Sequence, residues 1–146
     1  MFFWRISNYA DLSGGGGTIA HGRWHRRLRQ VVYLASCSPG ALIEALVHFD
    51  RADLPNSLQL LKIQMTASLE IQALGSQQSA SGWASNLEVT QNLGDRWLDE
   101  GSAALAQVPS AIVPGAFNYL LNPAHVDAVK VHLVEAQRFK LDPRFF

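Results

Sequence analysis

The chain has little of what disulfide scaffolds, membrane proteins and exported proteins need. Its 146 residues include one cysteine, Cys37, which excludes an internal disulfide bond. No apolar run approaches the roughly 20 residues of a membrane-spanning helix. Arg5 interrupts the N-terminal apolar run too early for a signal peptide. We therefore expect a cytoplasmic protein that does not contact a membrane.

Charge is also scarce and carries no bias of sign. Lys and Arg number 12, Asp and Glu number 12, and charged residues make up 16% of the chain. A neutral protein has no overall field to draw it onto nucleic acid or anionic lipid, so neither is expected as a direct partner. Apolar residues reach 48%, and a surface this lean in charge favours a face covered by another protein.

Common catalytic and metal-binding patterns are missing as well. The five histidines show no His-Glu-x-x-His spacing and there is no pair of cysteines, so no metal site is expected. The chain has no Gly-x-Ser-x-Gly elbow, which disfavours a hydrolase that uses Ser110 as nucleophile. Cys37 falls in a predicted turn, where local packing is its simplest role.

The hydrophobic pattern predicts one α/β (α+β) domain over residues 1–146, since domains commonly run to about 100–200 residues. Strands alternating with helices favour a mixed, twisted sheet with surrounding helices. The predicted strands cover residues 2–6, 31–35, 58–65 with a bulge at 60–61, 103–113 and 129–139.

Two helices are predicted from start signals followed by helix-forming residues. The first begins at Ser38-Pro39 and runs to about residue 49. The second begins at Ser85, with Glu88 completing a capping box, and runs toward Gly101. Gly94 is predicted to bend or split this second helix. Irregular loops are predicted at 14–17 and 75–82.

Glu44 is the first candidate for chemistry, because it is the only carboxylate within residues 41–49. It lies one helical turn before His48, so the two side chains form a narrow polar stripe on a helix that is otherwise apolar. The ordinary interpretation is a solvated stripe. The alternative puts Glu44 on the wall of a cleft, where a carboxylate removed from water needs a cationic or hydrogen-bonding partner.

Arg23 is the predicted partner of Glu44, since it precedes the strand that leads through a tight turn into the Glu44 helix. Tyr33 lies on that strand. Taken singly, Arg23 would more often be a surface cation and Tyr33 a half-buried strand residue. Together with Glu44 they can bind a phosphorylated sugar that carries a flat ring. Ser110 is either a buried, backbone-bonded hydroxyl or a site residue at a strand end, and Asn118 is predicted to brace a loop.

Five short motifs, in their order along the chain, resemble the RES-domain family. The resemblance runs from about Arg5 to Arg144. Its motifs are Gly22-Arg23-Trp24, Val31-Val32-Tyr33, Glu44-Ala45-Leu46-Val47-His48, Val108-Pro109-Ser110-Ala111-Ile112-Val113-Pro114 and Asn118-Tyr119-Leu120-Leu121-Asn122-Pro123-Ala124-His125.

The resemblance implies a bacterial toxin that depletes NAD, its substrate, on a fold related to ADP-ribosyltransferases. It also implies a partner antitoxin with a helix-turn-helix DNA-binding region. The family's site residues correspond to Arg23, Tyr33, Glu44 and Ser110, with Asn118 as a further substrate-binding candidate. One departure is the basic loop 25–30, where relatives commonly carry Asn after the Trp.

Cleavage of the nicotinamide–ribose bond needs stabilisation of an oxocarbenium-like sugar, while nicotinamide leaves as a neutral base, so one carboxylate suffices. Glu44 is expected at the ribose and the developing charge, and Tyr33 is expected to stack on nicotinamide. Arg23 is expected at a phosphate or ribose, and Ser110 in a supporting hydrogen bond.

Three alternatives stay open from the sequence. The acceptor of ADP-ribose could be water or phosphate, as in an NAD glycohydrolase or phosphorylase, or a protein, as in an ADP-ribosyltransferase. A non-enzymatic module that binds nucleic acid through the basic stretch 21–29 is a further alternative. The apolar end Phe145-Phe146 fits either a homodimer contact or packing onto the core.

Overall fold

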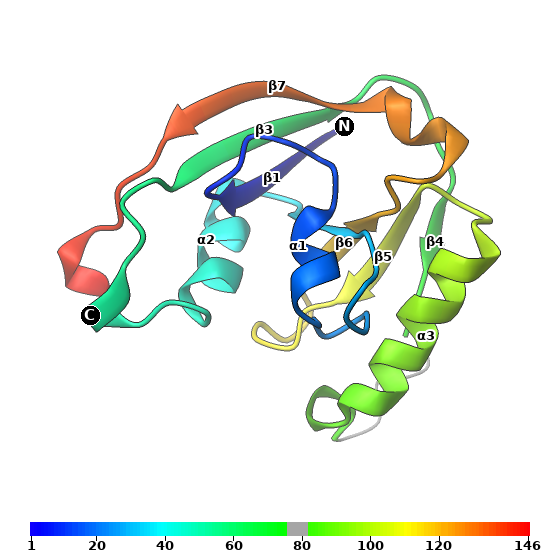
Figure 1. Ribbon diagram of the computed structural model, residues 1–146, viewed down its shortest axis with the longest axis horizontal. Helices are drawn as coiled ribbons and strands as arrows, with labels where there is room; N and C mark the ends of the chain where they lie inside the picture. The colour runs from blue at the N-terminus through cyan, green and yellow to red at the C-terminus, as the bar shows by residue number, and fades with distance from the viewer. Residues whose placement is uncertain (76–81) are drawn as a thin grey trace.

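The computed structural model describes residues 1–75 and 82–146 and contains a seven-stranded mixed sheet. The strand order is β4-β5-β6-β2-β1-β3-β7, in which β4 and β5 are parallel and the other neighbours antiparallel (Figure 1). The strands are β1 (Phe2–Ser7), β2 (Val32–Ala35), β3 (Gln59–Met65), β4 (Ile71–Ala73), β5 (Leu105–Pro109), β6 (Phe117–Leu121) and β7 (Val131–Arg138). The predicted mixed sheet with surrounding helices is confirmed.

Helices flank this sheet. Within the described residues the α-helices are α1 (Gly15–Ile19), α2 (Ser38–Leu46) and α3 (Leu87–Glu100). Short 3-10 turns are η1 (Arg51–Asp53), η2 (Trp83–Ser85), η3 (Val126–Lys130) and η4 (Pro143–Phe145). No helix in the described part of the chain has the length and apolarity to cross a membrane.

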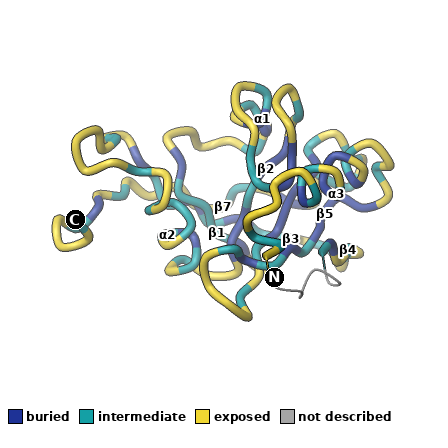
Figure 2. Tube along the Cα trace, turned by 90° about the horizontal axis from the view of Figure 1, so that it is seen from below, coloured by how far each residue is buried: buried dark blue, intermediate teal, exposed yellow. Residues whose placement is uncertain are grey.

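The two faces of the sheet carry different side chains. One face holds the larger apolar cluster, in which Phe3, Val32 and Leu121 are at most 1% exposed. The other face is covered by helices, and we call it the helix face. There α2 packs on β1 and β2, while Trp97 of α3 packs with Trp24 against β5 and β6. Figure 2 shows that burial concentrates in the strands and that the C-terminal end is largely exposed.

Helix α2 begins one residue earlier than a Ser38 cap would allow. Cys37 is the N-cap, and its Sγ accepts a hydrogen bond from Gly40 N at 3.4 Å. Pro39 fits the first turn, where its missing N–H leaves no bond unmade. The helix ends at Leu46 rather than at Phe49, and Ala41 is its buried residue against the sheet.

Helix α3 corrects two predictions about its course. Its N-cap is Asn86, whose Oδ1 accepts from Val89 N at 3.4 Å. Ser85 belongs to η2 and donates instead to the carbonyl of Gly82. The helix runs unbroken through Gly94, because the glycine serves close packing: a Cβ there would lie 1.7 Å from the carbonyl oxygen of Trp24.

The strand prediction was incomplete around residues 103–121. Strand β5 ends at Pro109, and the predicted strand 103–113 is wrong beyond it because Ser110–Ala116 turns the chain back. Strand β6 then follows where a loop was predicted, so Asn118 lies on a strand. Strand β4 was also missed, since three residues are too few for a clear alternation.

Two smaller differences concern a bulge and a glycine run. The bulge in β3 falls at Lys62/Ile63 rather than at 60–61. The glycine run includes the start of α1, with Gly14 at φ 73 as its N-cap, so the predicted irregular loop is wrong from Gly15 onward. The loop predicted at 75–82 lies mostly outside the described residues.

Candidate functional site

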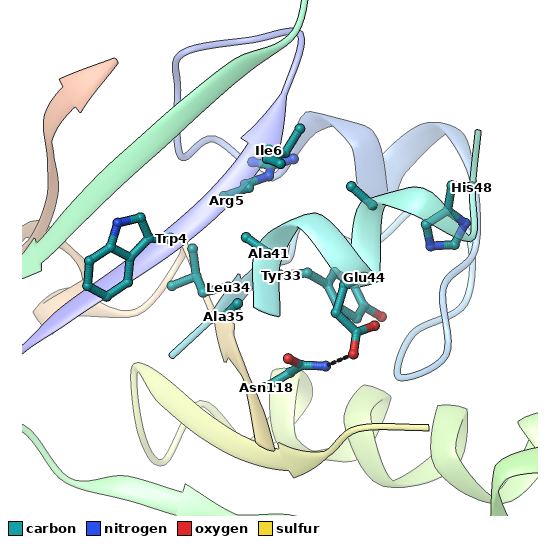
Figure 3. Close-up of a pocket in the computed structure, with 11 residues that line it drawn as sticks. Trp4, Arg5, Ile6, Tyr33, Leu34, Ala35, Ala41, Glu44, His48 and Asn118 are labelled. Atoms are coloured by element: carbon teal, nitrogen blue, oxygen red, sulfur yellow. Dashed lines mark hydrogen bonds between the residues drawn. The ribbon is translucent and has the colours of Figure 1, made fainter. Parts of the chain in front are cut away.

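A pocket of about 170 Å³ lies on the helix face between α2 and strands β1, β2 and β6 (Figure 3). Its wall is largely apolar, with Trp4 from β1 and Ala41 from α2 among the lining residues. Its polar lining residues are Glu44 from α2, His48 just after the end of that helix, Arg5 from β1 and Asn118 from β6. An apolar cavity with a few convergent polar groups is the usual form of a small-molecule site.

The Glu44 carboxylate is fixed through one of its oxygens. Its Oε1 accepts hydrogen bonds from Ser110 Oγ and from Asn118 Nδ2, each at 2.7 Å. Ser110 directly follows β5, and Asn118 pairs with Ala35 on β2 and with Val108 on β5. The β5–β6 hairpin therefore supplies both donors, and it ties α2 to the sheet.

The hydroxyl of Ser110 is held as a donor. Its Oγ accepts from the backbone N–H groups of Ile112 and Val113, both at 3.1 Å, and the side chain is buried. Two amides occupy the oxygen's acceptor sites, so its one proton goes to Glu44. A serine in this state is a poor nucleophile, and the geometry speaks against a serine hydrolase.

The second oxygen of Glu44 is open. Among the described residues, both hydrogen bonds to this carboxylate end on Oε1 and none on Oε2. Figure 3 shows the carboxylate at the pocket with one oxygen bonded to Asn118. The arrangement fixes the direction of a negative charge while leaving one oxygen for a ligand.

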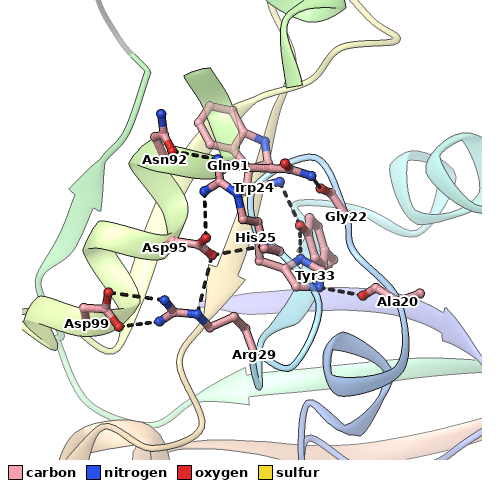
Figure 4. Close-up of polar contacts among 11 residues, drawn as sticks. Ala20, Gly22, Trp24, His25, Arg29, Tyr33, Gln91, Asn92, Asp95 and Asp99 are labelled. Carbon is pink, nitrogen blue, oxygen red and sulfur yellow. Dashed lines mark hydrogen bonds and ion pairs between the residues drawn. The ribbon is translucent and has the colours of Figure 1, made fainter. Parts of the chain in front are cut away.

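Tyr33 contributes its ring to the same pocket while its hydroxyl is engaged elsewhere. The hydroxyl accepts from Trp24 N at 3.0 Å and lies 2.8 Å from His25 Nδ1 (Figure 4). Burial raises the pKa of Tyr33 well above its ordinary value, against smaller lowering effects of the Trp24 amide and the Arg23 charge. The phenol is therefore neutral at physiological pH.

Arg23 is not where the sequence led us to expect it. Its guanidinium donates to the carbonyl of Ala84, and its own carbonyl accepts from Thr90 Oγ1 at 2.6 Å. It does not line the pocket, and in the described part of the chain it forms no ion pair with Glu44. The neutral donors Ser110 and Asn118 occupy the place predicted for a cation.

The structure therefore brings Glu44, Ser110, Asn118 and the Tyr33 ring together, with Arg23 outside the pocket. It adds Trp4 and Arg5 of β1, which sequence reasoning missed as site residues. Trp4 pairs with Ala35 of β2, and this cross-strand pairing is not contained in the local pattern of residues 2–6. His48, noted as the neighbour of Glu44, also lines the pocket.

The basic stretch is fastened to α3 (Figure 4). Asp95, 7% exposed, accepts from Arg26 N at 3.1 Å and from Arg26 Nη1 at 3.0 Å, and Arg29 Nε lies 3.8 Å away. Arg26 also donates to Asn92 at 2.7 Å, and Arg29 pairs with Asp99. Phosphates would have to compete with these carboxylates for the two arginines.

Metal ligands do not cluster in the described residues: no group of three or more His, Cys, Asp or Glu side chains there could hold an ion.

Comparison with known proteins identifies the family of this chain. The RES domain profile matches residues 2–142. Toxin Res of Pseudomonas putida is 45% identical over 148 residues, covering 100% of both chains. The Prs ADP-ribosylating toxin of Sphingobium sp. is 35% identical over 154 residues, covering 97% of this chain and 94% of that one.

A solved structure has the same fold. It is the crystal structure of the M. tuberculosis MbcT–MbcA toxin–antitoxin complex, with a TM-score of 0.75 at 16% identity, covering 95% of this chain and 84% of that chain. The likeness shows that the two chains share this α+β fold. With a family profile over nearly the whole chain and full-length relatives named as toxins, this chain belongs to the RES domain toxin family.

Proposed function

We propose that this protein is the toxin of a toxin–antitoxin pair and depletes NAD by cleaving the bond between nicotinamide and ribose. The observation that carries the proposal is the Glu44 carboxylate, fixed through Oε1 by Ser110 and Asn118 with Oε2 open beside the Tyr33 ring. Family membership supports it, and a 35% identical relative is named an ADP-ribosylating toxin, an activity that consumes NAD.

The chemistry needs what this carboxylate offers. Breaking the glycosidic bond moves its electron pair onto nicotinamide, which leaves neutral, and positive charge develops on the ribose. A negative charge already oriented by fixed donors stabilises that charge without reorganising during the reaction. Glu44 is the proposed residue for this task, with the Tyr33 ring stacking on nicotinamide.

The size of the pocket limits which part of NAD enters. Its volume of about 170 Å³ is below the about 300 Å³ at which sites for drug-sized ligands begin. We therefore expect it to hold nicotinamide and the adjacent ribose, with the pyrophosphate outside. Arg23, which acts electrostatically on the Tyr33 hydroxyl from outside the pocket, is the proposed pyrophosphate ligand once its guanidinium leaves the Ala84 carbonyl.

The acceptor of ADP-ribose defines two versions of this function. Transfer to water or phosphate makes the protein an NAD glycohydrolase or phosphorylase. Transfer to a protein is the second candidate, and the name of the 35% identical relative favours it. Product mass separates them: free ADP-ribose indicates water, a phosphorylated ADP-ribose indicates phosphate, and a mass increase on a protein indicates transfer.

The central experiment follows NAD over time with purified wild-type protein and the Glu44→Gln variant, with and without phosphate and with a bacterial lysate as a source of protein acceptors. Wild type should consume NAD, and Glu44→Gln should be slower by about a hundredfold to a thousandfold, the usual loss for one well-placed electrostatic contact. Folded wild type that leaves NAD intact under all these conditions would show that the substrate is wrong.

We further infer that the partner is an antitoxin protein with a helix-turn-helix region, as the resemblance implies, and that the pair acts in the cytoplasm. The structural neighbour was solved as a toxin–antitoxin complex. Phe145 is 49% exposed, so this apolar end is available to an antitoxin or to a second copy in a homodimer. Co-expression with the neighbouring open reading frame tests the first idea, and light scattering of the purified chain tests the second.

A further inference from the structure

His25 is buried next to the site, and both of its ring nitrogens have partners. The residue is 3% exposed. Nε2 lies 3.0 Å from the carbonyl oxygen of Ala20, and Nδ1 lies 2.8 Å from the Tyr33 hydroxyl. A carbonyl only accepts, so Nε2 carries the proton. In the neutral ring Nδ1 is then an acceptor, and the Tyr33 hydroxyl donates to it.

Gly22 makes this contact possible. A Cβ at residue 22 would lie 2.5 Å from the Tyr33 hydroxyl oxygen and 2.7 Å from Cε1 of His25. The Gly22 amide also donates to the His25 carbonyl at 3.1 Å, which closes the loop around the hydroxyl. With the Trp24 amide donating to it, the Tyr33 hydroxyl accepts one bond from the loop and gives its only proton to His25.

Burial keeps this histidine neutral. It lowers the pKa of His25 below 6.5, and the smaller raising effects of the Ala20 carbonyl, Asp95 and the Gly17 carbonyl do not reverse it. His21 lowers the pKa slightly further. A neutral ring is the form that accepts the Tyr33 proton.

We propose that His25 is a positioning residue for Tyr33: it holds the hydroxyl so that the ring forms a fixed wall of the pocket beside Glu44. Tyr33 then acts on substrate through its ring, because its hydroxyl proton is already committed. The inference rests on the proposed function, in which this ring stacks on nicotinamide. In this proposal the Tyr33 hydroxyl orients the ring and does not take part in the reaction.

A double-mutant cycle tests the coupling. His25→Leu removes the acceptor and should raise KM for NAD about tenfold, the effect of one lost buried hydrogen bond, while changing kcat less. In a Tyr33→Phe background the same change should add almost nothing, since the hydroxyl is already gone. His25→Gln, whose amide oxygen can accept the proton, should recover part of the loss. Losses in KM that simply multiply would overturn the inference.

His132→Leu is the matched control, because His132 is exposed on β7, outside the residues that line the pocket. If wild type leaves NAD intact, the proposed function fails and the role of His25 fails with it. If wild type consumes NAD and His25→Leu behaves like His132→Leu, only the role of His25 fails.

An independent readout needs no activity and covers the case in which His25→Leu fails to fold. Nitrogen-15 NMR of histidine-labelled wild type should show His25 as the neutral tautomer with its proton on Nε2, and Tyr33→Phe should shift the Nδ1 resonance. A proton on Nδ1, or a resonance that Tyr33→Phe leaves in place, would contradict the proposal.

Discussion

Asp95 and Glu44 both lie on the helix face, and the protein holds them in different ways. Asp95 is buried and pairs with Arg26 and Arg29, whose charges neutralise it. Glu44 is half-buried and is held by the neutral donors Ser110 and Asn118, so its charge is oriented, and it forms no ion pair with the residues that the structure describes. The difference separates a carboxylate that fastens a loop from one that is available to a cationic ligand.

The largest expected effects come from removing each charge in turn. Glu44→Gln should abolish most NAD consumption while leaving the free energy of unfolding nearly unchanged, because an amide oxygen still accepts from Ser110 and Asn118. Asp95→Asn should do the reverse: it should cost roughly 1.5–3 kcal/mol of stability through weaker bonds to Arg26, with a small effect on kcat. Urea denaturation and NAD assays on both variants measure this, and a large stability loss in Glu44→Gln would erase the contrast.

The packing of α3 against the basic stretch 21–29 gives the next largest effect, which is on stability. Gly94→Ala should destabilise the protein by about 3 kcal/mol, because the added Cβ meets backbone that cannot give way easily. Gly16→Ala is the control: no atom lies within 4 Å of a Cβ there, so Ala in α1 should be neutral or mildly stabilising. Thermal unfolding of both variants would sharpen the comparison, and equal melting temperatures would contradict it.

Two buried hydroxyls extend the comparison at a smaller scale. Ser110→Ala removes a donor to Glu44 and leaves the Ile112 and Val113 amides without partners, so it should cost roughly 1–3 kcal/mol. Thr90→Val, which removes the bond to the Arg23 carbonyl, should cost a similar amount. Only Ser110→Ala should also lower kcat; a comparable fall in kcat for Thr90→Val would mean that the two regions are not separate.

Acidity should act on the loop through His25, in the smallest of these effects. Its folded pKa is lowered, so the unfolded chain binds the extra proton first as pH falls below 6.5. The stability contribution is present above this value and declines below it, with a slope of at most about 1.4 kcal/mol per pH unit. His25→Asn should flatten the profile between neutral pH and pH 5 relative to wild type, whereas His132→Asn should leave it unchanged. Parallel wild-type and His25→Asn profiles would refute the assignment.

Much of the fold was predictable because its strands and α2 have strong local signals. The runs at 2–6 and 31–35 and the helix start at Ser38-Pro39 fall within one or two residues of the observed elements. Strand β6 was missed because Asn118 and the nearby prolines resemble a loop, and only pairing with β2 and β5 makes it a strand. Local pattern does not contain that pairing.

The candidate site was predictable in part: two of its residues had a local signal, but the contacts between them did not. The polar stripe on a short apolar helix singled out Glu44, and a serine between prolines singled out Ser110. Which groups would hold the carboxylate depended on how the hairpin packs against α2, and a nearby arginine in the sequence was the wrong choice of partner. Arg23 instead lies in the loop that α3 holds in place. Thr90 donates a hydrogen bond to the Arg23 carbonyl, and Asp95 accepts one from the Arg26 amide.

The two hydrogen bonds to Glu44 also set when the site can exist during synthesis. They join residues 66 and 74 positions apart in the chain, and such long-range contacts form only after the intervening segment has closed. A nascent chain that has not yet reached Asn118 carries the Glu44 helix but no oriented carboxylate. The oriented carboxylate therefore forms only after the chain has been made through Asn118, later than the helix that carries Glu44.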